Sequence, residues 1–326
     1  MQLGMIGMGR MGSGMVARLL DSGHDCIVYD RTETATLGPA QCGALVASSL
    51  EELVDLLRPP RAVWMMIQTE HVGEQVSRLS CLMDSGDILV DGGNSHFRDD
   101  CQRASLLKEA GIAYLDVGTS GGLHGRQRGY CLMIGGDSKA VQQLDPIFRS
   151  LAPGCEDTPT AQDRRETANT AEHGYLHCGP VGAGHFAKMV HNGIEYGMMA
   201  AYAEGLSVLR HARLALTTAD QGMGDQDDLF DIPKMAELWR RGSMISSWLL
   251  DLTAQILAED PDLSAYHSQV GDTGLGRALV ETAIQESVPV HVLAAALFDR
   301  FSSRGGSDFG NQLLCAMRSR FGGHST

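Results

Sequence analysis

The sequence predicts an α/β protein in which a Rossmann-type domain with a parallel sheet is followed by an all-α domain. Three observations predict this fold. Short β-rich runs alternate with amphipathic stretches in the first half of the chain, which is typical of a parallel sheet covered by helices. A glycine-rich turn directly follows the first run. Beyond Pro180 the strand signals almost vanish and helical periodicity takes over.

Five runs are expected to form strands of the first domain: residues 3–6, 26–30, 61–67, 87–91 and 113–117. Residues 153–179 break the pattern with Pro, Gly, Thr and charged residues, which predicts a connection with a polar insertion near 155–172. We therefore expect a dinucleotide-binding domain over residues 1–178 and a helical substrate and dimerisation domain over 179–326.

The helical domain is predicted from the spacing of apolar residues and from its last helix. One helix face is expected to carry Ile245, Trp248, Leu249, Leu252 and Ile256. Ser307 and Asp308 are suitable capping residues for a last helix that ends before Gly322. No internal repeat is found.

Composition excludes several classes of function. The net charge of −14, with acidic residues scattered along the chain, argues against a nucleic-acid partner. Arg10 and several glycines interrupt the apolar N-terminal stretch, so neither a signal peptide nor a membrane segment is expected. Eight cysteines without CxxC spacing predict a reducing, cytoplasmic location and no metal site. His173 and His177 are interpreted as loop histidines rather than metal ligands.

The first predicted strand runs into Gly-Met-Gly-Arg-Met-Gly at residues 7–12 and then a helix, which is the order of a dinucleotide-binding fold. Gly7 permits the turn, Gly9 lets the backbone approach a pyrophosphate, and Gly12 lets helix and strand meet. Asp30 ends the second strand, where its carboxylate can accept hydrogen bonds from the adenosine ribose. The predicted cofactor-binding residues are Gly7, Met8, Gly9, Arg10, Met11, Gly12, Asp30, Arg31, Ile67 and Asn94.

Asp30 also bears on the choice of cofactor. Its carboxylate would repel the additional phosphate of NADP and bond to the free hydroxyl of NAD. Arg31 and Thr32 follow directly and could hold that phosphate. NAD is therefore the predicted cofactor, with NADP as the alternative.

Two glycine-containing loops follow predicted strands, at residues 91–95 (DGGNS) and 120–122 (SGG). Ligands of parallel sheets bind where such loops leave the carboxyl ends of the strands. The most informative stretch is residues 179–196 (GPVGAGHFAKMVHNGIEY), which is expected to enter a long helix. One of its faces would carry the polar side chains of Lys188, His191, Asn192, Glu195 and Tyr196. Its other side would direct Phe186, Val190 and Ile194 into the core.

Lys188 and Glu195 are seven residues apart, which places their Cα atoms about 10 Å apart along a helix axis. A molecule the size of a sugar fits between them. A solvated helix face could carry the same two residues. The glycines before Lys188 argue against that alternative, because an exposed helix would use better helix formers.

The sequence resembles the 6-phosphogluconate dehydrogenases, and more closely their short form. The likeness is carried by residues 7–12, 91–95, 118–122, 129–133, 179–196 and 318–324. It implies a Rossmann-type domain followed by a helical domain that forms a homodimer or higher homo-oligomer. It also implies a pentose phosphate pathway enzyme that oxidises and decarboxylates 6-phosphogluconate to ribulose 5-phosphate and carbon dioxide.

By this resemblance Lys188 is the general base that takes the proton from the hydroxyl at carbon 3, and Glu195 is the acid that protonates carbon 1 after carbon dioxide leaves. His191 and Asn192 complete the catalytic set. The resemblance further implies that the phosphorylated sugar acid is bound by Asn94, Ser120, Gly121, Gly122, Tyr196 and Arg277, and by Arg318 and His324 of a partner subunit. No metal is required.

Two departures from the family pattern concern the phosphate pocket. Ser246 stands where the family usually has a phosphate-binding arginine, and losing such a contact costs on the order of 1.5 to 3 kcal/mol. Arg240 or Arg241 could compensate. Ala278 and Leu279 follow Arg277 in place of an expected Trp-Thr pair. Weaker binding of 6-phosphogluconate is therefore expected, and Ser246→Arg should tighten it.

Two alternatives remain at this stage. One is another β-hydroxyacid dehydrogenase that acts on an unphosphorylated or different sugar acid, for which Lys188 would serve equally well. The other is a nicotinamide-binding protein without catalysis. The pair Arg318 and His324 discriminates against the first, because a cationic pair is superfluous without a phosphate.

Overall fold

The computed structural model of the protein describes residues 1–154, 170–212 and 229–322. The chain divides into two compact units, Met1–Val190 and His191–Thr326. This division falls inside a long helix, and the domain boundary expected at residue 179 stays a prediction. The insertion predicted near 155–172 lies mostly outside the described residues.

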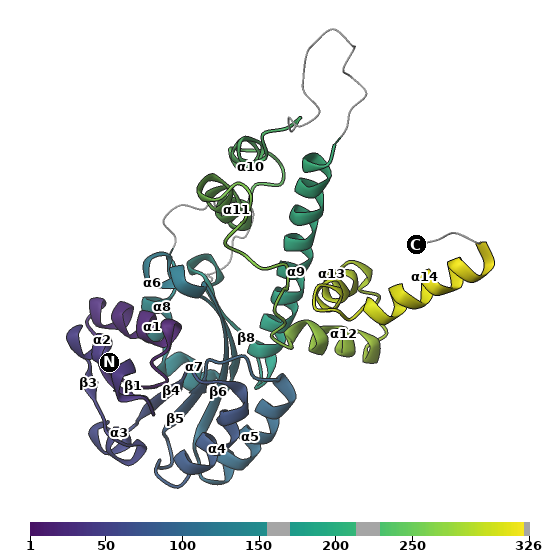
Figure 1. The fold of residues 1–326 in the computed structure, drawn as a ribbon. Coiled ribbons are helices and arrows are strands. Elements are labelled where there is room, and N and C mark those ends of the chain that lie inside the picture. The colour runs from purple at the N-terminus through teal and green to yellow at the C-terminus, as the bar shows by residue number, and fades with distance from the viewer. Residues whose placement is uncertain (155–169, 213–228, 323–326) are drawn as a thin grey trace, which may run out of the picture. The chain divides into compact units, whose positions relative to one another are not determined.

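The first unit is built on an eight-stranded sheet with the strand order β3-β2-β1-β4-β5-β6-β7-β8 (Figure 1). The strands are β1 (Gln2–Ile6), β2 (Asp25–Tyr29), β3 (Leu45–Val46), β4 (Ala62–Met65), β5 (Ile88–Asp91), β6 (Ala113–Ser120), β7 (Cys131–Gly136) and β8 (Tyr175–Gly179). Every described pair is parallel except β6 with β7, which is antiparallel. The predicted Rossmann-type sheet is confirmed, and the antiparallel pair is an addition to it.

The five predicted strands correspond to β1, β2, β4, β5 and β6, while β3, β7 and β8 were not predicted. The interpretation of residues 153–179 as a connection is wrong at its end, because Tyr175–Gly179 forms β8. Among the described strands it pairs with β7 alone, and Tyr175 is its one buried residue, so it lacks the apolar run of a central strand. His177 therefore lies in a strand, and its Nε2 is bonded to the carbonyl oxygen of Gly136 at 2.9 Å.

Helices cover both faces of the sheet because the inner strands are apolar on both sides (Figure 1). On β1, Leu3 and Met5 face the core shared with α1 (Arg10–Asp21) and α8 (Asp145–Leu151), whereas Ile6 faces the core shared with α3 (Leu50–Leu56) and α4 (Thr69–Leu79). The helices of this unit are α1 (Arg10–Asp21), α2 (Leu37–Gln41), α3 (Leu50–Leu56), α4 (Thr69–Leu79), α5 (Phe97–Glu109), α6 (Gly125–Arg128), α7 (Ser138–Gln143) and α8 (Asp145–Leu151). Short 3-10 turns lie at Glu33–Thr36, Gly122–His124 and Thr170–His173.

The second unit is helical in its described residues, as predicted. Helix α9 (Ala183–Arg210) begins in the first unit and continues into the second. It is followed by α10 (Ile232–Arg240), α11 (Trp248–Glu259), α12 (Leu275–Gln285), α13 (His291–Ser302) and α14 (Asp308–Gly322). A small core joins α10 to α11 through Ile232, Ala236, Ala254 and Leu257.

Two details of these helices differ from expectation. Ser247 accepts a hydrogen bond from the N–H of Leu250 and caps α11, so Ile245 precedes the helix instead of belonging to it. The buried side of α11 is formed by Leu250, Ala254 and Leu257 rather than by the predicted face, since Ile256 is exposed. The last helix begins at Asp308 as predicted but includes Gly322.

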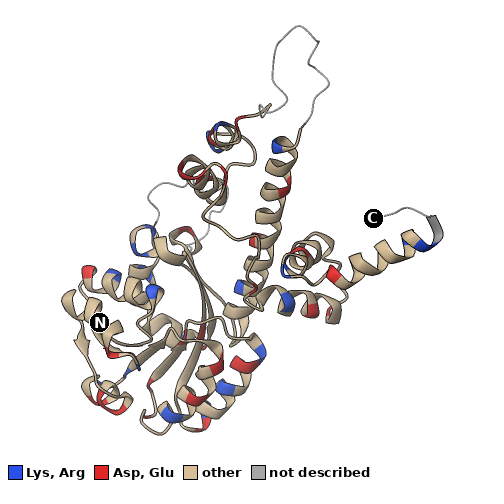
Figure 2. Ribbon diagram, in the orientation of Figure 1, with Lys and Arg blue, Asp and Glu red and all other residues tan. Residues whose placement is uncertain are grey.

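Acidic and basic residues are interspersed along the helices of both units, in agreement with the scattered charge of the sequence (Figure 2). Within the described residues, a helix long and apolar enough to cross a membrane is not found.

Candidate active site

The glycine-rich turn between β1 and α1 has the backbone that a dinucleotide requires. Gly7 has a positive φ of 96°, and a side chain there would collide with the carbonyl of Met66. A Cβ on Gly12 would overlap the carbonyl oxygen of Gly7, so helix and strand can meet only without one. At Gly9 an added Cβ would enter open space, which leaves the N-terminus of α1 accessible to a phosphate.

Asp30 lies beside this turn and stabilises it through hydrogen bonds to the backbone. One oxygen of its carboxylate accepts the N–H of Met8 at 2.7 Å, and the other accepts the N–H of Thr32 at 2.8 Å. Each oxygen keeps a further lone pair that a ribose hydroxyl could use. Asp30 therefore fixes the loop as well as offering an acceptor, a role that the sequence did not reveal.

A cavity of about 630 Å³ opens over this turn. Among the predicted cofactor residues, those that line it are Gly7, Met8, Gly9, Asp30, Arg31 and Ile67. Arg10, Met11, Gly12 and Asn94 do not line it. Thr32, which was considered for the additional phosphate of NADP, also lines it. Further lining residues were not predicted, namely Ile6, Tyr29, Ala35, Met66, Gln68, His71, Glu74, Gln75 and Arg78. Their position in the sequence could have indicated them. Most of them lie at or after the ends of β2 and β4, which flank β1 at the edge of the sheet where Gly7 is found.

Both predicted substrate loops leave the carboxyl ends of strands, at β5 and β6. Asn94 is exposed in the first loop. In the second, Gly121 and Gly122 have φ values of 142° and 53°, a backbone that favours glycine. Ser120 is the last residue of β6. The structure thus places these residues at the same edge of the sheet.

Lys188 lies in the second turn of α9, and its side chain rests on β6. A Cβ on Gly118 would overlap Cβ of Lys188 and would lie 2.8 Å from the carbonyl oxygen of Gly184. The residue as a whole is only 7% exposed. A buried lysine is unusual, because desolvation disfavours the charged ammonium. Lys188 is therefore not part of a solvated helix face.

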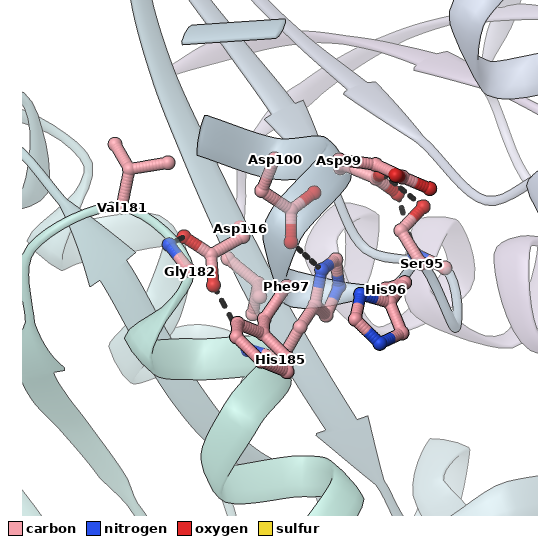
Figure 3. Close-up of polar contacts among 12 residues, drawn as sticks. Ser95, His96, Phe97, Asp99, Asp100, Asp116, Val181, Gly182 and His185 are labelled. Carbon is pink, nitrogen blue, oxygen red and sulfur yellow. Dashed lines mark hydrogen bonds and ion pairs between the residues drawn. The ribbon is translucent and has the colours of Figure 1, made fainter. Parts of the chain in front are cut away.

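A buried polar network adjoins the start of α9 (Figure 3). Asp100 of α5 bonds to Nδ1 of His185 at 2.7 Å and accepts the hydroxyl of Tyr114 at 3.0 Å. Asp91, at the end of β5, accepts the hydroxyls of Ser95 at 2.6 Å and of Tyr114 at 3.1 Å. The guanidinium of Arg103 contacts both carboxylates. No local pattern in the sequence indicates this network, since its members come from four separate elements, β5, α5, β6 and α9, and from the loop that carries Ser95.

The charges of this network are set by burial and by mutual attraction. Burial opposes the positive charge of His185, but its hydrogen bond with Asp100 and the nearby carboxylates of Asp91 and Asp116 outweigh this, and they raise its pKa to about 9. His185 is thus a cation at neutral pH. Burial raises the pKa of Asp116 and that of Tyr114. Among the described residues, Nε2 of His185 is a buried atom without a hydrogen-bond partner.

Asp91, Asp100 and His185 also bring three potential metal-ligand atoms within 4.8 Å of one another. Arg103 contacts both carboxylates, and its guanidinium opposes the approach of a divalent cation. The hydroxyl of Tyr114 and the ring of His185 use further carboxylate oxygens. The arrangement fits an ion-pair network better than a metal centre.

The remaining motif residues of α9 belong to the second unit. His191 bonds to Oδ1 of Asn192 at 3.2 Å and lies 3.8 Å from the carboxylate of Glu195. All three are partly exposed. Tyr196 is buried, and its hydroxyl is 3.2 Å from Oγ1 of Thr273. The five residues predicted for the polar face thus all lie on α9, where Lys188 and Tyr196 are buried and the other three are partly exposed.

The apolar side of α9 differs from expectation. Phe186 and Ile194, which were predicted to point into the core, are 38% and 52% exposed. His185 and Met189 are buried instead, because they share the side of the helix on which Lys188 meets the sheet. The division of α9 into a polar face for chemistry and an apolar face for packing is wrong in this form.

Arg300 of α13 is a cation that the sequence did not single out. Its guanidinium lies 3.5 Å from the centre of the Tyr196 ring and donates to the carbonyl oxygen of Gly271 at 2.6 Å. None of its hydrogen bonds within the described residues goes to a carboxylate. Arg277, which was predicted to bind substrate, is bonded to Asp272 at 2.6 Å and is half exposed.

The compensation expected from Arg240 or Arg241 at the phosphate pocket is not supported. Arg240 is bonded to Glu237 and Asp251, and Arg241 to Glu237, so carboxylates already engage both guanidinium groups. Ser246 is exposed in the turn before α11. Arg318 is exposed on α14, and His324 lies outside the described residues.

Comparison with known proteins agrees with this geometry. Residues 2–159 match the family model of the NAD binding domain of 6-phosphogluconate dehydrogenase, and residues 184–309 match the model of its C-terminal domain. The chain is 36% identical over 326 residues to the NAD(+)-dependent, decarboxylating 6-phosphogluconate dehydrogenase of Haloferax volcanii, with 99% of this chain and 98% of the relative covered. The chain belongs to the 6-phosphogluconate dehydrogenase family. The predicted resemblance is thereby confirmed, and the chain is an oxidoreductase of this family.

Longer members of the 6-phosphogluconate dehydrogenase family match over part of their length. The NAD(+)-dependent, decarboxylating enzyme of Bacillus subtilis is 33% identical over 313 residues, which are 92% of this chain and 61% of that protein. The structure of Plasmodium falciparum 6-phosphogluconate dehydrogenase, described with NADP+ and with 6-phosphogluconate, is 27% identical with a TM-score of 0.77. The match covers 99% of this chain and 65% of the Plasmodium falciparum chain. This chain thus matches the Haloferax volcanii relative over almost its whole length, and it spans about three fifths of the Bacillus subtilis one.

Proposed function

We propose that this protein catalyses the oxidative decarboxylation of 6-phosphogluconate to ribulose 5-phosphate and carbon dioxide, with NAD as the preferred cofactor. The observation that carries the proposal is the burial of Lys188 on α9 against Gly118 of β6. A buried amine can give up its proton near neutral pH, as a general base must. The names of the relatives in Haloferax volcanii and Bacillus subtilis agree with this reaction.

The residues divide the reaction between them. Lys188 takes the proton of the hydroxyl at carbon 3. A nicotinamide cofactor held at the glycine-rich turn and Asp30 would supply the acceptor for the hydride that leaves this carbon. The β-keto acid then loses carbon dioxide, because the electrons of the breaking bond flow into the ketone. Glu195, two turns further along α9, donates a proton to carbon 1 of the resulting enediol. His191 and Asn192 lie between them and orient the hydroxyls.

The cavity over the glycine-rich turn fits the dinucleotide. Gly9 leaves the N-terminus of α1 open to the pyrophosphate, and Asp30 stands at the end of β2 for the adenosine ribose. Asp30 favours NAD because its carboxylate repels the additional phosphate of NADP. Arg31 and Thr32 also line the cavity and could hold that phosphate, so NADP is kept as a second cofactor.

The phosphate of the substrate would bind near Tyr196. Arg300 stacks on the ring of Tyr196 and supplies a cation there, in place of the contribution once expected from Arg240 or Arg241. Arg318 and His324 would complete the pocket from a partner subunit. An exposed apolar row on α14, formed by Phe309, Leu313 and Met317, supports a homodimer through the helical domain. Cytoplasmic localisation is supported by the seven described cysteines, which are free thiols.

The test is a turnover assay with 6-phosphogluconate and NAD in which reduced cofactor, ribulose 5-phosphate and carbon dioxide are measured together. We expect the three products in equal amounts. Lys188→Met should lower kcat by about 10²- to 10⁴-fold, the range of a general base. Lys234→Met, at an exposed lysine paired with Asp231, is the matched control and should retain activity. Turnover by Lys188→Met within tenfold of the wild type would contradict the proposal.

A second candidate is a β-hydroxyacid dehydrogenase for an unphosphorylated or different sugar acid. It is favoured by Ser246, and by the carboxylates that already engage Arg240 and Arg241. Comparing kcat/KM for 6-phosphogluconate with that for gluconate separates the two. A preference for gluconate, or reduced cofactor without carbon dioxide, would support this second candidate.

A further inference from the structure

The start of α9 is held by a side chain from the sheet. Asp116, in the middle of β6, is completely buried (Figure 3). One of its carboxylate oxygens accepts the N–H of Gly182 at 2.7 Å, and the other accepts the N–H of His185 at 2.8 Å. Its carboxylate thus satisfies two of the N–H groups that the first turn of a helix leaves unpaired.

This arrangement differs from an ordinary helix cap, in which the capping side chain belongs to the residue just before the helix. Asp137 at the start of α7 is an example, since it accepts the N–H groups of Lys139 and Ala140. Asp116 lies 66 residues before Gly182 and belongs to another element. The cap therefore fixes the position of α9 on the sheet as well as satisfying its backbone.

The side chain of His185 provides a second attachment. Its Nδ1 is bonded to Asp100 on α5 at 2.7 Å, and Asp100 also accepts the hydroxyl of Tyr114 from β6. The first turn of α9 is consequently held by its backbone to β6 and by a side chain to α5. Two attachments to different elements fix both the position and the rotation of the helix.

Glycines allow the helix to lie this close to the sheet. A Cβ on Gly184 would overlap the carbonyl oxygens of Asp116 and Met133, and a Cβ on Gly135 would overlap the carboxylate of Asp116. These contacts place the helix backbone directly against β6 and β7. A small displacement of the first turn of α9 would therefore displace the residues of the next turn as well.

Lys188 lies in that next turn, three residues after His185. Gly118, which contacts Lys188, lies two residues after Asp116 on β6. We propose that Asp116 and His185 are positioning residues that hold Lys188 at the end of β6. The inference rests on the proposed function, in which Lys188 is the general base. Neither residue needs to touch the substrate.

The first test uses Asp116→Asn, which keeps the volume but turns one acceptor into an amide donor facing an N–H group. Misplacing a catalytic group by about 1 Å can cost on the order of 10² in rate. We expect kcat to fall by about 10²-fold, with KM for NAD within about twofold of the wild type, because the glycine-rich turn is untouched. Asp137→Asn is the matched control: it makes the same substitution at the cap of α7, where a single oxygen accepts both N–H groups and the amide oxygen can keep them, so it should leave kcat unchanged.

A second measurement reports on Lys188 without any turnover. The chain has four lysines, and Lys108, Lys139 and Lys234 are exposed while Lys188 is buried. Acetylation with acetic anhydride, followed by mass spectrometry, gives the rate of each one. We expect the rate at Lys188 to change by at least about threefold in Asp116→Asn, because its access and its surroundings are altered, and to stay unchanged in Asp137→Asn. The other three lysines should react at their wild-type rates in both variants.

The second variant pair separates positioning by His185 from simple packing. In His185→Asn the amide nitrogen takes the place of Nδ1 and can still donate to Asp100, whereas His185→Leu cannot. We expect His185→Asn to recover at least about tenfold of the kcat lost in His185→Leu. Hydrogen exchange of the peptide spanning residues 180–190 should be faster in His185→Leu and in Asp116→Asn.

The outcomes are distinct. The inference would be overturned if Asp116→Asn had the kcat of the wild type. It would also be overturned if the acetylation rate of Lys188 were unchanged in both Asp116→Asn and His185→Leu. Equal losses of kcat in His185→Asn and His185→Leu would overturn it as well. If the wild type does not produce ribulose 5-phosphate, the proposed function fails, while acetylation and hydrogen exchange still decide whether Asp116 and His185 position Lys188.

Discussion

Gly118 lies directly beneath Lys188, so close that a β-carbon on the glycine would overlap the β-carbon of the lysine. Gly118→Ala should therefore displace α9 or the lysine side chain. We expect a destabilisation of about 1 to 3 kcal/mol, as for other overpacked sites, together with a fall in kcat at unchanged KM for NAD. Urea unfolding and steady-state kinetics measure the two effects.

The control for this variant is Gly73→Ala in α4, where an added Cβ meets open space. Alanine is favoured over glycine in a helix by roughly 0.5 to 1 kcal/mol, so this change should be neutral or stabilising. Equal effects of Gly118→Ala and Gly73→Ala would mean that the contact with Lys188 is unimportant.

Asp30 is expected to set both cofactor affinity and cofactor choice. Asp30→Asn removes the charge that repels the additional phosphate of NADP. It also weakens one of the two backbone hydrogen bonds of this side chain, either to Met8 of the glycine-rich turn or to Thr32 after β2. We expect kcat/KM for NAD to fall by about tenfold or more, and the value for NADP to change less. Asp25→Asn, at the exposed start of β2, is the control. An unchanged ratio of the two cofactors would count against this role.

His185 should make stability depend on pH. Its pKa is raised from 6.5 to about 9 in the folded protein, so its contribution is complete below pH 6.5 and is lost as the pH rises to about 9. We expect the free energy of unfolding to fall across this window by at most about 3 kcal/mol. His185→Asn, which has no titrating ring, should show a flatter profile in urea unfolding at pH 6, 7.5 and 9.5. Parallel profiles would refute the assignment.

Arg300 is expected to bind the phosphate beside Tyr196. Arg300→Ala should raise KM for 6-phosphogluconate by about 10- to 100-fold, the cost of a charge-assisted contact, with little effect on gluconate. Arg241→Ala is the control, because Glu237 already engages that guanidinium. Ser246→Arg should lower the same KM. Equal losses on both substrates in Arg300→Ala would speak against a phosphate contact.

The exposed row on α14 should be a dimer interface. Phe309, Leu313 and Met317 are spaced four residues apart along one side of the helix, and Phe309 is 76% exposed. Leu313→Glu should convert dimers to monomers in light scattering and abolish activity, because Arg318 would act from the partner subunit. Gln312→Glu, on the same helix, should leave the assembly intact. A monomeric wild type with full activity would exclude this arrangement.

Much of the first domain is predictable because its signals are local. Gly7 has a positive φ that favours glycine, and the strands β1, β4 and β5 are mostly apolar and almost completely buried. The strand β3 has only two residues, and β7 ends in two glycines, so neither shows a β-rich run. The antiparallel direction of β7 depends on its pairing with β6, which leaves no trace in composition.

Only those parts of the site that lie on one helix or strand could be predicted from the sequence. The row from Lys188 to Tyr196 follows from helical periodicity, since all of it lies on α9. Periodicity does not reveal which side of a helix meets the sheet, so Phe186 was assigned to the core and His185 was overlooked. The pairing of Asp116 with Gly182 and that of Asp100 with His185 join residues 66 and 85 positions apart. Such contacts exist only after the strands have assembled.

The cap that Asp116 supplies to α9 also bears on the order in which the chain can fold. A helix whose first turn is completed by a strand residue cannot find its final starting point before β6 is in place. A polypeptide beginning near residue 180 would contain Lys188, Glu195 and all that lies between, yet it would lack the acceptor that defines where the helix begins. Transplanting the helical part onto another dinucleotide-binding scaffold would therefore require an aspartate at the matching place in the recipient sheet.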